Sequence, residues 1–188
     1  QWPEDNGPFS YKLGVGDNLT LTLLRDEKNI SALEPSDDND EQNMFIESQK
    51  EVVLETKGRI GSDGSVLLLE IGRLEAKGKT LNELRSEVRN ILIRNGTSPR
   101  FQLEITDFKS QKAYLTINQA SRVVSLDDQK TTIKEVISSA GVGFKSGTIT
   151  NVRLQRKGVE YVTTLRGIFS QHANDIIIYS GDHIFVED

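Results

Sequence analysis

The alternation of apolar and polar residues predicts several short strands and two helices along this chain of 188 residues. Apolar side chains recur at every second position in four stretches: residues 19–21, 101–105, 113–117 and 184–186. This period is typical of half-buried strands. Residues 81–92 instead place Leu81, Leu84, Val88, Ile91 and Leu92 on one helical face. The patterns together predict an α+β fold.

The first expected helix is bounded by clear signals. Thr80 and Glu83 form a capping box, in which each side chain can bind a backbone amide of the first turn. Asn95 and Gly96 supply the stop. The helix is therefore expected to run from residue 81 to about residue 94.

The segment before this helix predicts a turn and two strands. Asp63 and Gly64 favour a tight hairpin turn, and we expect a positive φ at Gly64. An apolar strand follows from residue 66 to residue 71, with a bend at Gly72. Alternation then continues to Gly78. The segment contains architectural residues and no nucleophile or metal cluster.

The second half predicts a similar order of elements. Residues 113–117 form an alternating strand, which residues 122–126 are expected to continue. Thr132 and Glu135 form a second capping box before a helix that ends at Gly141.

One small element occurs twice. Gly16-Asp17 and Gly181-Asp182 each precede an alternating strand. Glycine supplies the turn, and the aspartate can accept hydrogen bonds from backbone amides where the strand begins. Such turns are common, so two independent tight turns are the preferred explanation and the similarity does not prove an internal duplication.

The first half resembles the polysaccharide export domain of the outer-membrane proteins that secrete capsule and exopolysaccharide (Wza type). The resemblance is carried by the Asp-Gly turn, the Ile71-Gly72 pair, Gly78 and the capped helix. An upstream signature completes it: Tyr11, Leu13, Gly14, Gly16, Asp17, Leu19 and Leu21. Val15 and Leu69 stand where the family usually has proline.

The second half resembles the soluble-ligand-binding β-grasp (SLBB) domain that follows the export domain in this family. Ala120-Ser121 replaces the usual Pro-Gly after its first strand, and Ala140-Gly141 remains of its Ala-Gly-Gly. We therefore expect two closely packed domains, an export domain of mixed strands with one main helix at 1–110 and a β-grasp-like domain at 111–188. An acidic insertion at about 25–50 interrupts the first.

The resemblance implies a non-enzymatic role in the periplasm, associated with the outer membrane. It implies a homo-oligomeric ring through which polysaccharide passes, and an inner-membrane polysaccharide copolymerase as partner. It also implies a lipidated cysteine before Gln1, which this sequence does not contain. No signal peptide and no C-terminal membrane helix are recognised, so a soluble periplasmic part is expected.

Composition narrows the alternatives. The net charge of −5 disfavours a nucleic-acid partner, and no apolar run approaches the roughly 20 residues of a membrane helix. The absence of cysteine excludes disulfides and thiolate metal sites. The acidic stretch at 34–41 is expected to be an exposed loop. The alternative is a calcium site, because the stretch supplies carboxylate ligands, but its spacing does not match that of an EF-hand loop.

Several catalytic-looking signals have simpler explanations. Gly78-Lys79-Thr80 lacks the first glycine of a phosphate loop, and the loop at 141–147 follows a helix instead of preceding one. His172 and His183 have no partner ligands nearby in sequence. The carboxylates considered for a glycosidase pair are Asp63, Glu70 and Glu75. We expect no catalytic residue, no metal and no cofactor.

The main alternative function is a monomeric carbohydrate-binding or sensing module, which needs exposed aromatic rings. The candidates are Trp2, Tyr114, Tyr161 and Tyr179, of which the last two are expected in strands. A hydrolase or lyase acting on exopolysaccharide is the third interpretation.

Overall fold

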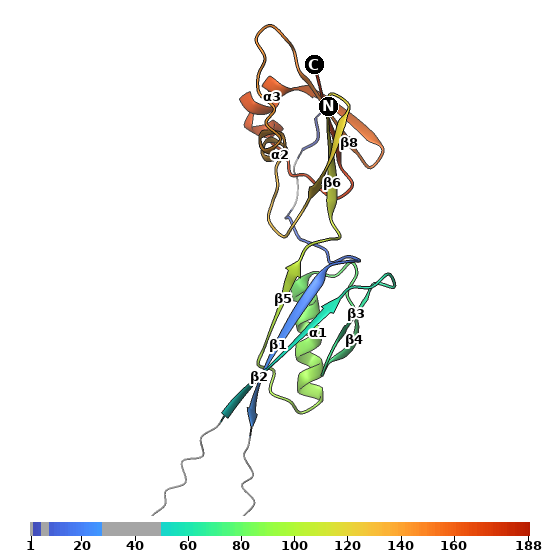
Figure 1. The fold of residues 1–188 in the computed structure, drawn as a ribbon, viewed down its shortest axis with the longest axis vertical. Coiled ribbons are helices and arrows are strands. Elements are labelled where there is room, and N and C mark those ends of the chain that lie inside the picture. Colours follow the sequence, from blue (N-terminus) through green and yellow to red (C-terminus); the bar gives the residue numbers. More distant parts are fainter. Residues whose placement is uncertain (1, 5–7, 28–49) are drawn as a thin grey trace, which may run out of the picture.

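The computed structural model describes residues 2–4, 8–27 and 50–188, which form two lobes stacked end to end (Figure 1). Each lobe has its own sheet and its own hydrophobic core. The α+β class expected from the sequence is confirmed. Residues 28–49, which include the acidic stretch and its suggested calcium site, lie outside the described residues.

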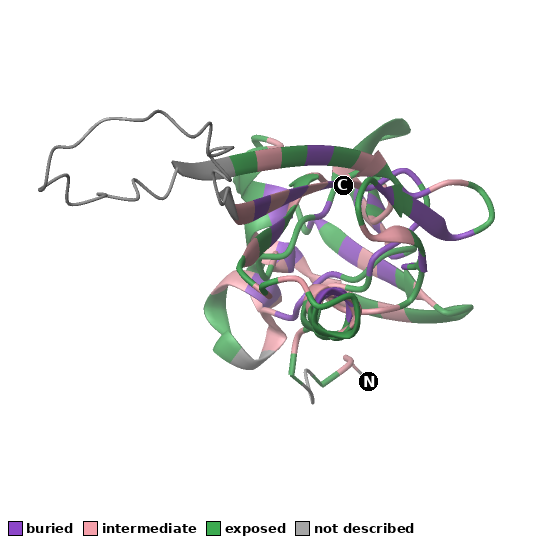
Figure 2. Cartoon of the chain, turned by 90° about the horizontal axis from the view of Figure 1, so that it is seen from below, coloured by how far each residue is buried: buried purple, intermediate pink, exposed green. Residues whose placement is uncertain are grey.

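The first lobe is a three-stranded antiparallel sheet covered by one helix. Its elements are β1 (Asn18–Glu27), β2 (Lys50–Arg59), β3 (Ser65–Leu68), β4 (Gly72–Glu75), α1 (Leu81–Arg94) and β5 (Phe101–Asp107). The sheet order is β2-β1-β5, so β1 is central. Leu19, Leu21 and Leu23 of β1 are buried with Leu84 and Val88 of α1 in one core. Buried residues alternate with intermediate ones in the first part of β1, and exposed residues alternate with buried or intermediate ones along β5 (Figure 2).

The segment between β2 and α1 differs in part from the expectation. The turn at Asp63-Gly64 joins β2 to β3, but these two strands belong to different sheets. The single strand expected at 66–71 was wrong, because the chain turns after Leu68 and β4 begins at Gly72. Glu70 has a φ of +73° in this turn, a conformation that its side chain does not favour and the sequence therefore did not signal.

The second lobe is a mixed five-stranded sheet with helices on one face. Its elements are β6 (Lys112–Ile117), β7 (Ala120–Ser125), α2 (Ile133–Ser139), β8 (Asn151–Arg156), β9 (Val159–Thr164), α3 (Leu165–Ser170), the 3-10 turn η1 (His172–Asn174) and β10 (His183–Glu187). The order is β7-β6-β10-β8-β9, with β10 in the centre and parallel to β6.

Two expectations for the second lobe were wrong. Residues 122–126 do not continue the strand at 113–117, because Asn118 and Gln119 (φ 44° and 73°) turn the chain into an antiparallel hairpin. Tyr179 lies before a turn and not in a strand. The hairpin was missed because Asn118 and Gln119 stand where a tight turn usually has glycine, and Tyr179 is excluded from the strand because its carbonyl accepts from Asp182 in the Gly181 turn.

The N-terminal segment extends to the second lobe. Trp2 packs against the core of the second lobe, and its indole N–H donates to the carbonyl of Asn174 at 3.0 Å. Figure 1 shows the N-terminus and the C-terminus at the same end of the molecule. The segment around Tyr11 lies in the core of the first lobe, so the start of the chain contacts both lobes.

Candidate functional site

The first Gly-Asp turn forms a buried polar site in the segment that joins the two lobes. Asp17 is fully buried. Its Oδ1 atom accepts hydrogen bonds from the backbone amides of Lys109 and Ser110, both at 2.8 Å. Its Oδ2 atom accepts from the Gly14 amide (3.0 Å), the Tyr11 hydroxyl (3.0 Å) and the Ser110 hydroxyl (2.7 Å). We call these five residues the Asp17 junction.

The Asp17 junction fixes the connection between the lobes. Lys109 and Ser110 lie between the last strand of the first lobe and the first strand of the second. A buried carboxylate that accepts several hydrogen bonds holds its donors in one arrangement, because losing any of them leaves a buried polar group unpaired. The Tyr11 ring packs edge-on against Phe108 at 5.1 Å, and burial raises the pKa of Tyr11.

The structure explains why positions 14 and 16 of this turn are both glycine. Gly16 has a φ of +97°, which disfavours any side chain. A Cβ atom on Gly14 would lie 2.5 Å from the Cβ atom of Ser110, closer than two carbon atoms can approach. The sequence signature thus encodes a turn that brings its own backbone against the connection between lobes.

The second Gly-Asp turn has the same local form and a different partner. Asp182 is buried and accepts two hydrogen bonds from the Arg156 guanidinium, at 2.9 and 2.6 Å. It also accepts from the Tyr179 amide at 2.8 Å. Gly181 has a φ of +86°. Arg156 additionally lies over the Tyr179 ring, 4.9 Å from its centre.

The two turns correspond residue by residue. In each, the amide three residues before the aspartate donates to its carboxylate, and the aspartate amide donates to the carbonyl at that same position. Asp17 receives only uncharged donors, whereas Asp182 forms a two-bond ion pair with a cation. The first turn organises the connection between lobes, and the second organises the end of the β8 strand.

Asp63 and Gly64 serve the turn between β2 and β3. Asp63 accepts hydrogen bonds from the backbone and side chain of Ser65, and these bonds lower the pKa of Asp63. Gly64 has a φ of +84°, and a Cβ atom there would lie 2.9 Å from the Cβ of Lys77. The Gly64 carbonyl accepts from the amides of Ala76 and Lys77, so the turn also anchors the end of the β4 segment.

The start of α1 is tied to the Gly-Asp signature. The Thr80 side chain accepts from the Glu83 amide, and the Glu83 side chain accepts from the Thr80 amide, which lowers the pKa of Glu83. Gly78 (φ +83°) donates its amide to the Leu13 carbonyl, and Leu13 donates to Lys79. The helix start and the Asp17 junction are therefore neighbours.

The carboxylates considered for catalysis are engaged in surface contacts. Asp63 is held by its turn, and Arg73 pairs with it at 3.2 Å. Glu70 pairs with Arg25 at 2.6 Å on the surface, and Glu75 is exposed on β4. Gly72 has a φ of +101° and open space around it, as a turn end requires. None of the described residues form a group of three or more metal-ligating side chains.

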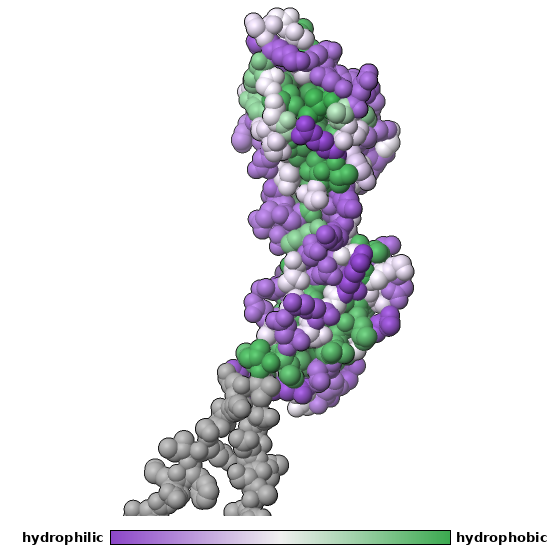
Figure 3. Space-filling view, in the orientation of Figure 1, coloured by the Kyte–Doolittle hydropathy of each residue, from purple (hydrophilic) through white to green (hydrophobic). Residues whose placement is uncertain are grey.

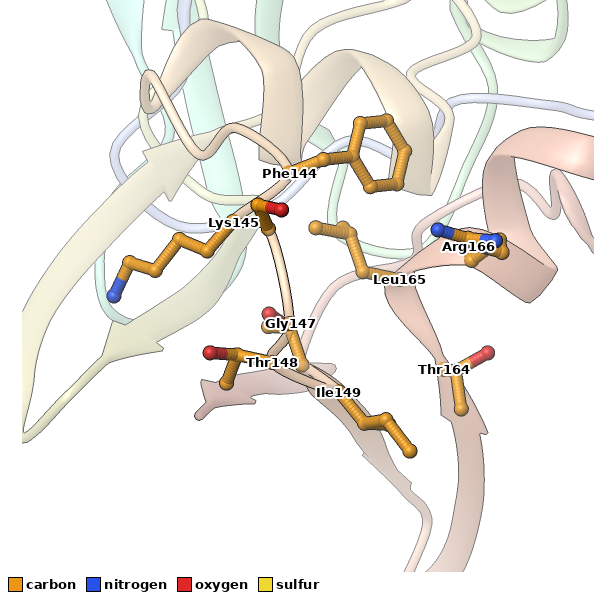
Figure 4. A pocket seen from close by; sticks show the side chains of 10 residues that line it. Phe144, Lys145, Gly147, Thr148, Ile149, Thr164, Leu165 and Arg166 are labelled. Carbon is orange, nitrogen blue, oxygen red and sulfur yellow. The ribbon is translucent and has the colours of Figure 1, made fainter.

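The glycine-containing loop after α2 lines a cavity of about 560 Å³. Phe144, which is 61% exposed, and Leu165 of α3 lie near one another, and Arg166 lies to one side (Figure 4). Lys145 points away from the cavity and pairs with Asp188, which lowers the pKa of Asp188. The sequence suggested only a surface loop here.

The histidines and aromatic residues occupy different environments. His172 is exposed in the 3-10 turn. His183 begins β10 and its Nε2 atom lies 3.0 Å from the Thr116 hydroxyl. Trp2 and Tyr161 pack against the second core, whereas Tyr114 and Tyr179 are 41% and 37% exposed. Of the four candidates, only Tyr114 and Tyr179 therefore have rings exposed enough to stack on a sugar.

A smaller cavity of about 220 Å³ lies between the lobes. Its lining residues come from the N-terminal segment, the connection and the second lobe: Phe9, Ser10, Tyr11, Lys12, Gln111, Leu126, Asp127, Ile178, Tyr179 and Ser180.

Among the helices of the described ranges, none has the length and hydrophobicity needed to span a bilayer.

Comparison with known proteins places these features in a family. The family described as "Polysaccharide biosynthesis/export protein" matches residues 5–106. The EPS I polysaccharide export outer membrane protein EpsA of Ralstonia nicotianae is 24% identical over 132 residues, and that of Ralstonia solanacearum is 23% identical over the same length. In both cases the match covers 68% of this chain and 35% of the relative.

The chain thus spans about a third of the length of these relatives. The family match contains the Asp17 turn, the Asp63-Gly64 turn and the capped helix α1. The resemblance of the first half to the polysaccharide export domain is confirmed, and the chain belongs to the polysaccharide biosynthesis/export protein family.

Proposed function

We propose that this chain is a non-enzymatic, periplasmic component of an exopolysaccharide export apparatus associated with the outer membrane. The family match over residues 5–106 carries the proposal, and the two similar proteins are named as outer-membrane exporters. Its partners are the polysaccharide, further copies of the chain and an inner-membrane polysaccharide copolymerase. The chain acts by enclosing a passage, so no bond of the polymer is made or broken.

We also propose that the second lobe is a β-grasp (SLBB-like) domain, and that the boundary between the two domains lies near residue 110. Its first two strands form a hairpin, α2 crosses one face of the sheet, and the last strand inserts in the centre, parallel to the first. The β5 strand ends at Asp107 and β6 begins at Lys112, which supports the boundary.

A ring subunit must present two different surfaces to its neighbours. Exposed apolar side chains on both lobes support this requirement: Val53, Leu67, Leu69 and Ile93 on the first, and Phe144 and Ile149 on the second. Figure 3 shows hydrophobic residues at the surface of both lobes. The Asp17 junction holds the two lobes in a fixed relation, which a closed ring needs if both contribute contacts.

A monomeric carbohydrate-binding or sensing module is the second candidate. The exposed ring of Tyr114 favours it, whereas Trp2 and Tyr161 are used by the core of the second lobe. The two candidates differ in self-association, because a sensing monomer needs no neighbour.

Deleting the gene in its host tests the proposed function. Polymer should still be made but remain with the cells, and complementation with the intact gene should restore secretion. The Asp17→Ala variant should restore less, since the relation between lobes is lost. Normal secretion by the deletion strain would contradict the role in export, and loss of all cellular polymer would indicate a role in synthesis.

A further inference from the structure

The second sheet has one face covered by helices and one open face. Residues such as Leu115, Leu154 and Ile184 point toward α2 and α3 and are buried, so their neighbours along each strand point the other way. The centre of the open face carries Tyr114, Thr116, Arg153, Gln155, His183 and Phe185. These side chains come from the three central strands of the sheet.

The rings on the open face form a continuous array. The His183 ring stacks on Phe185 with centres 4.2 Å apart, and the Tyr114 ring lies 5.6 Å from His183. The guanidinium group of Arg153 lies over Phe185 at 4.5 Å. Thr116 fixes the histidine through the 3.0 Å contact with Nε2. The array is therefore ordered before any ligand arrives, which reduces the entropy lost on binding.

The array is accessible and bordered by hydrogen-bonding groups. Tyr114 is 41% exposed, with Val123 (58%) opposite it on the neighbouring strand. Arg153 pairs with Glu187 at 3.4 Å, while its Nε–H is buried without a hydrogen-bond acceptor among the described residues. The Glu160 carboxylate is 3.9 Å from that nitrogen.

We propose that the open face around Tyr114, His183 and Phe185 is a contact site for the pyranose rings of the polysaccharide. The inference rests on the proposed function, which supplies the sugar chemistry. The C–H face of a sugar packs on the Tyr114 ring, and its hydroxyls bind Arg153 and Gln155. An exposed, shallow site of this kind binds weakly, as passage of a polymer requires.

The composition of the face favours a sugar over a second copy of the chain. The centres of protein–protein interfaces are depleted of charged residues. Here Arg153 lies at the centre of the face, next to Glu160 and Glu187. Lys112 adds a second cation, so the face carries two positive and two negative side chains. Because these charges balance, the face does not favour a partner surface that is strongly charged. The aromatic rings suit the apolar C–H face of a sugar unit, and the hydrogen-bonding side chains beside them suit its hydroxyl groups.

Amide NMR spectra of the whole chain test the site directly. The chain is titrated with short fragments of the source strain's exopolysaccharide, prepared by mild acid hydrolysis, and with maltohexaose as an unrelated sugar. The exopolysaccharide fragments should shift amides of β6, β8 and β10. Tyr114→Thr, which keeps a strand-forming residue, should weaken binding about tenfold, whereas Tyr114→Phe should retain it. Phe144→Ala provides the control, because it removes an exposed ring that lies outside this face.

Four results would overturn the inference. Shifts confined to other surfaces would place the sugar elsewhere, and no shifts at any concentration would exclude binding to the chain. Shifts of the same amides on raising protein concentration without sugar would identify the face as a protein interface. A folded Tyr114→Thr protein that exports polymer normally and shows unchanged sugar binding would reject the site but leave the export function intact. Melting curves of each variant verify that it is folded.

Discussion

Replacing Asp17 by alanine should destabilise the first lobe more than any surface substitution. The change removes the acceptor for three backbone amides and two hydroxyls. The hydroxyls can turn to other acceptors, but the amides of Gly14, Lys109 and Ser110 cannot. A buried donor left unpaired costs about 1–3 kcal/mol. The bond from Gly14 is buried and those from Lys109 and Ser110 are partly buried, so we expect a loss of about 3 kcal/mol, a large share of the about 5–15 kcal/mol by which whole domains are stable.

Urea unfolding with two probes measures this loss. Far-ultraviolet circular dichroism follows both lobes, whereas Trp2, the one tryptophan in the chain, reports on the second lobe. In Asp17→Ala the dichroism should begin to fall before the tryptophan emission changes, since the substitution acts on the first lobe. Asp107→Ala is the matched control, because the side chain of this nearby acid is 45% exposed and pairs with Lys109 at 3.5 Å and Asn18 at 3.3 Å, for a cost of about 0–1 kcal/mol.

An Asp17→Ala protein within about 0.5 kcal/mol of the parent would refute the reasoning. It would mean that the five hydrogen bonds are replaced by water at little cost. The junction would then hold no fixed relation between the lobes, and a different contact would have to be sought.

The remaining predictions concern turns and a helix cap. Gly64→Val should cost about 1 kcal/mol or more, because φ is positive at this position and the added atoms meet the Lys77 side chain, and a urea melt equal to the parent's would contradict this. Val15→Pro should stabilise by about 0.4–1 kcal/mol, whereas Leu69→Pro should not, since the Leu69 amide donates to a buried threonine hydroxyl; calorimetric melting of both variants decides the matter. Gln119→Gly should raise the melting temperature, because φ is +73° there, and a lower value would reject the turn. The pKa of Glu83 is lowered in the fold from its usual 4.5, so its contribution is present above pH 4.5 and lost as pH falls through the lower folded value. Glu83→Gln should therefore flatten the stability profile in acid, and an unchanged acid slope would show that the cap is not titrating.

Local signals in the sequence predicted the parts of the fold that depend on neighbouring residues. The helices α1 and α2 begin at Thr80 and Thr132 as their capping boxes indicate, because a cap is formed within four residues. The short helix α3 was not anticipated. It has a cap at Thr164, but Gly167 lies within it, and glycine normally weakens a helix. A Cβ atom at Gly167 would lie 3.0 Å from the Thr163 hydroxyl, which is information that only the packed structure contains.

Contacts between distant segments could not be predicted from the sequence. Asp17 was recognised as a turn residue, but its donors at Lys109 and Ser110 lie more than ninety positions away. The pairing of Asp182 with Arg156 and the docking of Trp2 on the second lobe are of the same kind. The two family positions that lack proline are now explained. Val15 and Leu69 are the second residues of turns whose third residue has a positive φ, where proline is favoured but not required.

The mass of the native assembly tests the central claim most directly. The full gene product, tagged and extracted from its own host in a mild detergent, is measured by light scattering over a range of concentrations. The export account predicts a defined multiple of the subunit mass, with open or dissociated forms on dilution. A single-subunit mass at every concentration, in a preparation that still restores secretion, would contradict the enclosed passage and favour the monomeric sugar-binding module.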